Sequence, residues 1–200
     1  MLKMVSTKSA SVLGVVLAFC AFVLPASASA AAANWTPVGT TGRIDSGNFG
    51  FSITALNVGW ACAQTTFHLT VDSAAVATIT ASSFVNCPGN VGAAVGCTLT
   101  FVGTNFPWRA TALDTTQIQI HGFDVDLTFE TTPGTLSECA HTGLQLRWTG
   151  TVTASFTSGA HTFDFNGATG LAAHIPVFGV TVPGAVRGSA TPTGTLNVIM

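Results

Sequence analysis

The densest group of ionisable side chains in the sequence lies within ten residues near the middle of the chain. Asp124, Asp126 and Glu130 would share one face of an extended strand, because alternate residues of a strand point the same way. His121 joins that face only if Gly122 forms a β-bulge. Two carboxylates at this spacing could bind calcium or act as an acid–base pair. A solvated strand face is the plainer interpretation, so we expect neither a catalytic nor a metal-ligating residue here.

The rest of the sequence offers no local motif for catalysis. It contains no Gly-x-Ser-x-Gly sequence of the kind that presents a nucleophilic serine. The histidines form no close pair, and we expect structural or surface roles for them. They are His68, His121, His141, His161 and His174. We therefore expect no cofactor, and a secreted hydrolase remains only an alternative.

Four cysteines follow the N-terminal region, and their even number predicts two disulfides in an exported chain. Their wide spacing differs from the close ligand pairs of structural zinc sites. We favour a Cys87–Cys97 disulfide, which would close the loop between two strands. Cys62 would then pair with Cys139. The other two pairings remain open.

Aromatic side chains are a second candidate contact surface. The segment from Phe106 to Trp108 is the best candidate for exposure, because Pro107 restricts it to a sheet edge or a bulge. Such a surface could bind a carbohydrate or a lipid. We expect Trp60 and Trp148 to lie in the core instead.

The first 30 residues have the features of a secretory signal peptide. Lys3 and Lys8 precede an apolar run over residues 12–24, and a small-residue cleavage site ends at Ala30. The apolar run is shorter than the roughly 20 residues that a membrane-spanning helix needs. We predict cleavage near Ala30 and a location outside the cell or on its surface.

Composition excludes several classes of protein. Only 7% of the 200 residues are charged and 48% are hydrophobic, which excludes a highly charged disordered chain. The formal net charge of −2 argues against a nucleic-acid partner. Both lysines lie in the predicted leader, so the remaining chain has no lysine for a Schiff base or a phosphate loop.

Alternation of apolar and polar residues dominates the chain after the leader. It is clearest from Leu144 to Thr157, which predicts a half-buried strand. Ser158-Gly159 then predicts a two-residue turn that places Phe156 opposite His161. Further strands are expected at 75–86, 106–113, 116–121, 123–130, 170–182 and 193–199.

This pattern predicts an all-β protein built as an antiparallel β-sandwich, with a closed β-barrel as the alternative. Turn signals recur between the strands, among them Pro183-Gly184. We expect a signal peptide over 1–30, a flexible N-terminal arm over 31–41 and a single all-β domain over 42–200.

The sequence also resembles a group of uncharacterised secreted proteins of high-GC Gram-positive bacteria. The stretches that carry the resemblance are Gly59-Trp-Ala-Cys62, Ser83-Phe-Val-Asn-Cys87, Phe106-Pro-Trp108 and residues 136–150. The resemblance implies export and a β fold. It implies no particular activity and no site residues.

Three functions fit these features. The first is a secreted or cell-envelope protein without catalysis, which binds an unknown envelope or extracellular ligand or has a structural role at a surface. The second is a β-barrel pore in an outer or mycolate membrane, supported by the long alternation that ends at Thr157. The third is the secreted hydrolase. We favour the first, and we regard membrane association as possible but not favoured.

Overall fold

The structure is a computed structural model, and it describes residues 34–88, 97–132, 139–157, 160–166, 168–194 and 196–199. Nearly all of these residues form β-strands, as the alternation predicts. No helix among them has the length and apolar character needed to cross a membrane.

The strands differ widely in length. Several pairs of consecutive strands are separated by only one to a few residues and continue one another. The strands are β1 (Asn34–Thr36), β2 (Thr41–Ser46), β3 (Phe49–Ile53), β4 (Val58–Cys62), β5 (Gln64–Ser73), β6 (Val76–Val85), β7 (Cys97–Gly103), β8 (Trp108–Ala112), β9 (Gln117–Thr131), β10 (Gln145–Thr157), β11 (Thr162–Asp164), β12 (Ala168–Ile175), β13 (Val180–Arg187), β14 (Ser189–Thr193) and β15 (Asn197–Ile199). Two short 3₁₀ helices, η1 (Thr54–Leu56) and η4 (Pro176–Phe178), join β3 to β4 and β12 to β13.

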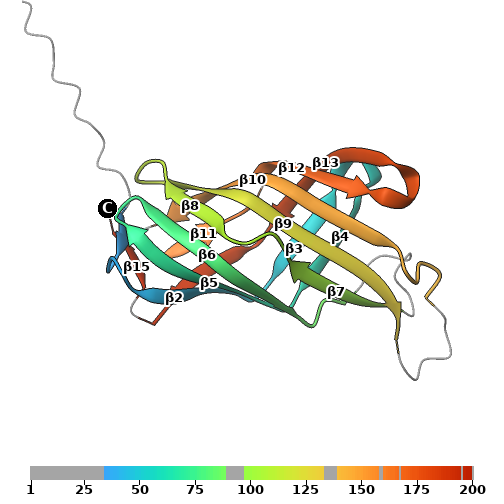
Figure 1. Cartoon of the computed structure of the whole chain (residues 1–200), viewed down its shortest axis with the longest axis horizontal. Helices are drawn as coiled ribbons and strands as arrows, with labels where there is room; N and C mark the ends of the chain where they lie inside the picture. The colour runs from blue at the N-terminus through green and yellow to red at the C-terminus, as the bar shows by residue number, and fades with distance from the viewer. Residues whose placement is uncertain are drawn as a thin grey trace, which may run out of the picture.

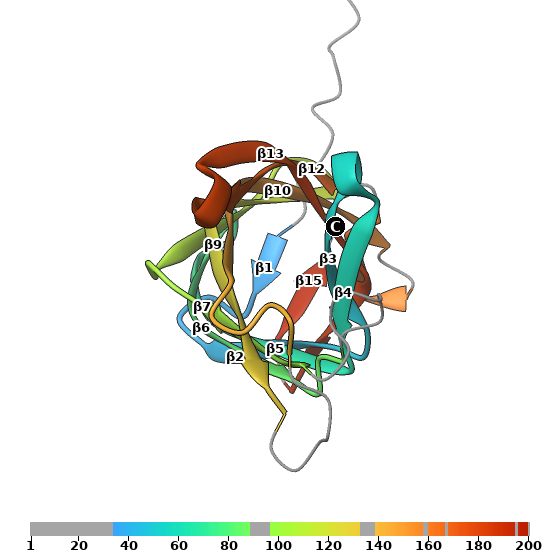
Figure 2. The same ribbon diagram turned by 90° about the vertical axis from the view of Figure 1, so that its right-hand side faces the viewer.

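The sheet closes on itself into an eight-stranded antiparallel barrel. Five of the eight barrel strands each consist of two consecutive labelled strands, namely β2–β3, β4–β5, β7–β8, β11–β12 and β13–β14. The other three barrel strands are β6, β9 and β10. Each barrel strand pairs with the next one along the chain, and the last pairs with the first through β13–β3 and β14–β2. Figures 1 and 2 show the barrel from the side and along its axis. The closed-barrel alternative is confirmed, and the chain does not form the two separate sheets of the β-sandwich that we favoured.

Aromatic side chains fill the interior of the barrel. Phe51 lies at its centre, stacked on Phe101 with ring centroids 4.8 Å apart and tilted against Trp148 at 5.2 Å. An eight-stranded barrel is just wide enough for side chains to fill. The expectation that Trp60 and Trp148 are core residues is confirmed, since both are buried.

The hairpin between β10 and β11 exists, but its register differs from the predicted one. Phe156 pairs with Phe163 and Thr157 with Thr162, a shift of two residues from the expected pairing of Phe156 with His161. The connection is longer than two residues, and His161 has a positive φ within it. A shift of two leaves each side chain on its predicted face, so both phenylalanines remain buried. The predicted turn at 158–159 lies outside the described residues.

The single strand predicted over 170–182 is wrong. The chain turns back at η4, and β12 and β13 form a hairpin in which Ile175 pairs with Val180. The predicted turn at Pro183-Gly184 instead lies within β13, where Pro183 pairs with Ala172. The two strands of this hairpin are both rich in apolar residues and are separated by only a short turn. Their alternation of apolar and polar residues therefore led to the prediction of a single strand.

Both ends of the described chain lie at the same end of the barrel (Figure 1). Within the predicted arm over 31–41, residues 34–36 form β1, which pairs with β15. Trp35 is buried there, and its ring centroid lies 5.7 Å from that of Phe163. In Figure 2 this two-stranded sheet is visible through the barrel, at its far end. We call the opposite end, which carries η1 and η4, the loop end.

The cysteines form two disulfides, as predicted, but the predicted pairing is wrong. Cys62 bonds to Cys87, and Cys97 bonds to Cys139. The register of β5 and β6 pairs Gln64 with Val85, and its continuation by two residues sets Cys62 opposite Cys87. Cross-strand register therefore decides this bond. Most of the loop that a Cys87–Cys97 bond would close lies outside the described residues.

Candidate functional site

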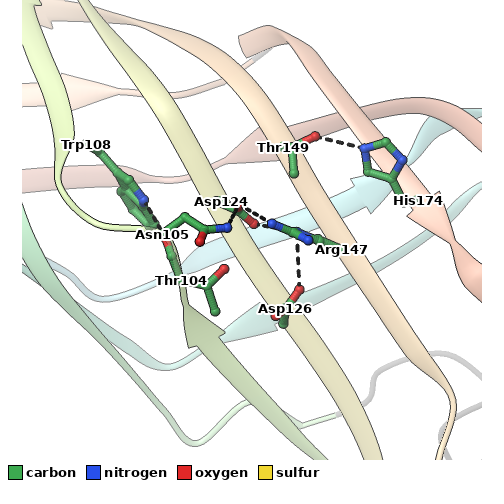
Figure 3. Close-up of polar contacts among 8 residues, drawn as sticks. All are labelled: Thr104, Asn105, Trp108, Asp124, Asp126, Arg147, Thr149 and His174. Carbon is green, nitrogen blue, oxygen red and sulfur yellow. Dashed lines mark hydrogen bonds and ion pairs between the residues drawn. The ribbon is translucent and has the colours of Figure 1, made fainter.

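The predicted polar cluster lies on the outside of β9, where Asp124 forms its centre (Figure 3). Its carboxylate accepts hydrogen bonds from Nε of Arg147 at 2.8 Å and Nη2 at 2.5 Å. Asn105 Nδ2 donates a third bond at 2.7 Å. These neighbours cover the carboxylate, and Asp124 is only 7% exposed although it faces outward. Asp126 lies farther from the guanidinium, with 3.7 Å between its Oδ1 and Nε of Arg147.

A β-bulge in β9 turns His121 to the same outer face, as the sequence analysis required. Thr151 of β10 pairs with His121 and Gly150 pairs with Phe123, which leaves Gly122 unpaired with a φ of 72°. Even so, His121 does not reach the carboxylates, since its polar contact is with the Thr151 hydroxyl at 3.5 Å.

The other end of the predicted cluster also stays apart from its centre. Glu130 is exposed near the end of β9 and lies opposite Thr98 of β7. The structure therefore brings together Asp124 and Asp126 from the predicted set, and adds two residues that the sequence analysis missed, Asn105 and Arg147. Arg147 had one available signal, because it occupies an outward position of the predicted strand beginning at Leu144.

The two carboxylates have opposite shifts of pKa. Burial raises the pKa of Asp124, but the hydrogen bonds from Arg147 and Asn105 outweigh it and hold the pKa below its usual value. Burial also raises the pKa of Asp126, and there the charge of Arg147 does not offset it. Arg147 in turn has a raised pKa, chiefly through its hydrogen bond to Asp124.

This geometry is that of a structural ion pair. Both oxygens of Asp124 are already occupied by donors from Arg147 and Asn105, so they are engaged in bonds that a metal ion or a substrate would have to displace. The backbone N–H of Thr104 also bonds the carbonyl of Asp124 at 2.9 Å. The cluster thus ties the loop between β7 and β8 to the centre of β9 and β10.

On the strands beside this cluster, a histidine lies between two threonines and contacts both. Thr149 of β10 lies 2.8 Å from Nε2 of His174 on β12, as Figure 3 shows. Nδ1 of the same ring lies 2.9 Å from the hydroxyl of Thr181 on β13. Both ring nitrogens of His174 are therefore engaged in contacts between strands.

The predicted aromatic contact surface is largely buried. Trp108 is fully buried, and its Nε1 donates a hydrogen bond to the carbonyl of Thr104 at 2.9 Å. Phe106 is half-buried and stacks on Trp108 with ring centroids 4.5 Å apart. The strand that begins at Trp108 directs this ring inward, so the indole does not offer a surface to a ligand.

Other exposed apolar side chains lie at the loop end, on two hairpin turns. The hairpin turns at η1 and η4 share one geometry, because each is a three-residue 3₁₀ helix followed by a left-handed residue, Asn57 or Gly179. Each turn exposes the apolar residue at its third position. Leu56 is 55% exposed and Phe178 is 72% exposed. Together with exposed Val177 and Val180 they form a group that we call the apolar rim.

A groove of about 480 Å³ lies beside Phe178 at this end. One wall is η4, and the other is the segment 140–145 that leads into β10. Leu144 is half-buried against the core and contributes an apolar side chain to this groove. His141 also lines it, with its ring 6.1 Å from that of the buried Phe129. Thus the loop end combines projecting apolar side chains with a shallow depression.

Comparison with protein families shows what the chain is similar to. A family model described as "Alkane oxidation protein activator PraA/PraB-like" matches residues 4–199. No curated protein shows significant similarity to the chain. The same is true of the solved structures. Because the family model spans almost the whole sequence, the chain belongs to the PraA/PraB-like family.

Proposed function

We propose that this protein is a non-catalytic accessory factor of alkane oxidation, which acts outside the cell or at its surface by binding. The observation that carries the proposal is the match of residues 4–199 to a family described as alkane oxidation protein activators. An activator promotes oxidation that an enzyme performs, so it needs a binding surface rather than a reaction centre.

An extracellular place of action is supported by two features. The first 30 residues have the pattern of a signal peptide. Two disulfides also suit an oxidising compartment, because cytosolic proteins rarely keep them. An accessory factor outside the cell would meet alkane before uptake, where the low solubility of the alkane in water limits its supply.

The orientation of side chains supports this proposal over the membrane-pore alternative. A membrane barrel turns apolar side chains outward to lipid and polar ones inward. In β10 the inward residues are apolar and include Trp148 and Val152, whereas Arg147, Thr149 and Thr151 face outward. The long alternation in this strand therefore belongs to a barrel with an apolar interior.

The test is deletion of the gene in the organism that encodes it. Growth would be compared on a liquid n-alkane, on the corresponding primary alcohol and on the fatty acid, each as the only carbon source. We expect slower growth on the alkane alone, because the alcohol and the acid enter the pathway after the activated step. Purified protein lacking residues 1–30 would then be added to the deletion culture.

Restored growth on the alkane would support an extracellular activator. Unchanged growth of the deletion strain on alkane would overturn the proposal, as would a host that does not oxidise alkanes. Equal slowing on all three carbon sources would also overturn it, because the defect would then lie outside alkane oxidation. Rescue by a gene copy but not by added protein would contradict the extracellular part of the proposal.

A further inference from the structure

We propose that the loop end of the barrel is a hydrocarbon-binding surface, which inserts the apolar rim into the surface of a liquid alkane. This inference rests on the proposed function and names its binding site. The rim consists of Leu56, Val177, Phe178 and Val180.

The turn geometry does not require apolar residues at the two tips. In each hairpin the turn is set by a left-handed residue, whose N–H bonds back to the carbonyl three residues earlier, from Asn57 to Thr54 and from Gly179 to Pro176. The side chains of Leu56 and Phe178 point into solvent and neither is part of the core. Val177, Phe178 and Val180 follow one another on the η4 turn, and adjoining exposed apolar side chains mark a contact surface.

Both tips reach the same end of the barrel, which makes a joint contact possible. Ile53 of β3 pairs with Gly184 of β13, so η1 extends alongside the start of β13. Figure 1 shows the two hairpin turns at the same end of the molecule, and Figure 2 shows them at separate points around that end of the barrel. A flat apolar surface could therefore touch both turns at once.

The loop end carries no formal charge in the segments that would make this contact. Residues 54–58, 140–145 and 176–180 contain no Asp, Glu, Lys or Arg. Moving a charged group into hydrocarbon is very costly, so this composition lowers the barrier to contact. The groove between segment 140–145 and η4 adds room for part of an alkyl chain beside Phe178.

The same absence of charge favours an alkane surface over a lipid bilayer. Proteins that bind anionic membranes place Lys or Arg where they meet the headgroups. No cation lies in the three segments themselves. Arg147 is bonded to Asp124, and the guanidinium of Arg187 lies beside Gly59 of β4, outside the segment 54–58. The rim thus matches an apolar liquid that has no headgroup layer.

The opposite end of the barrel offers a matched control. Val38 and Leu113 are also exposed apolar residues, but Leu113 lies in the turn before β9 and Val38 lies just after β1. Figure 1 places both of these segments away from the loop end. Substitutions there remove a similar kind of side chain without changing the rim.

The experiment is flotation with an n-hexadecane emulsion, using protein that lacks residues 1–30. Three proteins would be compared, namely wild type, the rim variant Leu56→Ser/Val177→Ser/Phe178→Ser and the control variant Val38→Ser/Leu113→Ser. The bound fraction is measured after centrifugation, and circular dichroism of protein recovered from the oil layer checks that the barrel remains folded. Neutral phosphatidylcholine vesicles and vesicles with anionic lipid serve as separate arms.

We expect wild type and control to bind the emulsion with affinities within a factor of two. The rim variant should bind about 100-fold more weakly, since three large apolar side chains no longer leave water. Equal binding of all three proteins would overturn the proposal, as would an equal loss in both variants. Recovery of unfolded protein, or stronger binding to either vesicle than to the emulsion, would overturn it too.

The outcome can be separated from that of the proposed function. If flotation depends on the rim but the deletion strain grows normally on alkane, the binding surface stands and the accessory role fails. If the deletion strain is impaired and the rim variant restores growth as well as wild type does, the accessory role stands and the site is elsewhere.

Discussion

At the scale of single residues, Asp124 and Asp126 show how two like side chains on one strand face acquire different properties. Arg147 and Asn105 donate hydrogen bonds to Asp124, whereas Asp126 lies 3.7 Å from the same guanidinium. The pKa of Asp124 is therefore lowered and that of Asp126 is raised. Their shared position in the sequence pattern gives no sign of this difference.

We predict that Asp124→Asn lowers the free energy of unfolding by about 1–3 kcal/mol at pH 7, because charged hydrogen bonds to Arg147 are lost. The lowered pKa means that ionised Asp124 stabilises the folded state. This contribution is complete above the pKa in the unfolded chain, near 3.9, and is lost as pH falls through the lower pKa of the folded state. Urea unfolding of both proteins from pH 7 to pH 2 measures it.

Asp126→Asn is the matched control. Because its pKa is raised in the folded state, the charge on Asp126 opposes folding at pH 7. The protonated form of Asp126 favours folding at low pH, and this contribution to stability is lost as pH rises through the folded-state pKa. We expect a free energy of unfolding at pH 7 that is unchanged or slightly higher. A loss as large as that of Asp124→Asn would contradict the proposed difference between the two carboxylates.

At the scale of elements, the close approach of β10 and β12 depends on a pair of glycines. Gly150 has a φ of +143°, and a Cβ there would lie 2.3 Å from the carbonyl oxygen of Gly170. A Cβ on Gly170 would likewise lie 2.5 Å from the carbonyl oxygen of Thr151. Each glycine thus makes room for the backbone of the neighbouring strand.

We predict that Gly150→Ala lowers the free energy of unfolding by about 2–4 kcal/mol, through backbone strain and collision with Gly170. Gly47→Ala is the control, because no atom lies within 4 Å of a Cβ built there. We expect that variant to remain within about 0.5 kcal/mol of wild type. Thermal and urea unfolding would measure both, and similar values for the two variants would refute the argument.

At the scale of the whole molecule, the barrel closes because its first strand pairs with its last, and the two disulfides restrain the loop end. Cys62–Cys87 spans 25 residues and Cys97–Cys139 spans 42. The first bond links the ends of β4 and β6, and the second links the start of β7 to the segment before β10. The first bond therefore restrains β4, which follows η1, and the second restrains the segment that continues into the groove wall at 140–145.

We predict that Cys62→Ala/Cys87→Ala lowers the free energy of unfolding by about 3 kcal/mol, because the unfolded chain regains the freedom of a 25-residue loop. Cys97→Ala/Cys139→Ala should cost about the same or slightly more, since its loop is longer. Urea unfolding under oxidising conditions provides the measurement. Peptide mapping of the wild type would contradict the pairing if it found a Cys87–Cys97 link.

Local patterns in the sequence predict strand faces well. The inward positions of β10, including Trp148 and Phe156, follow directly from the alternation, and even the shifted register of β10 and β11 preserves them. The sequence also indicated that His121 would share the outer face if Gly122 formed a β-bulge, and the structure has this bulge. A strand repeats every two residues along the chain itself, so such features need no distant contact.

Other features required the tertiary structure. Closure depends on β13 meeting β3, and the cysteine pairing depends on the register of β5 and β6. The burial of Asp124 depends on Arg147, which lies 23 residues away. The apolar rim likewise joins turns that are distant in the chain.

By itself, the sequence therefore determined an all-β chain, the inward and outward face of its main strands and the formation of two disulfides. The tertiary structure decided that the sheet closes into a barrel, which cysteines bond, which carboxylate is buried and where exposed apolar residues meet. The physical reason is that alternation is a property of neighbouring residues. Register and closure depend instead on contacts between strands, whose free energies only the complete arrangement determines.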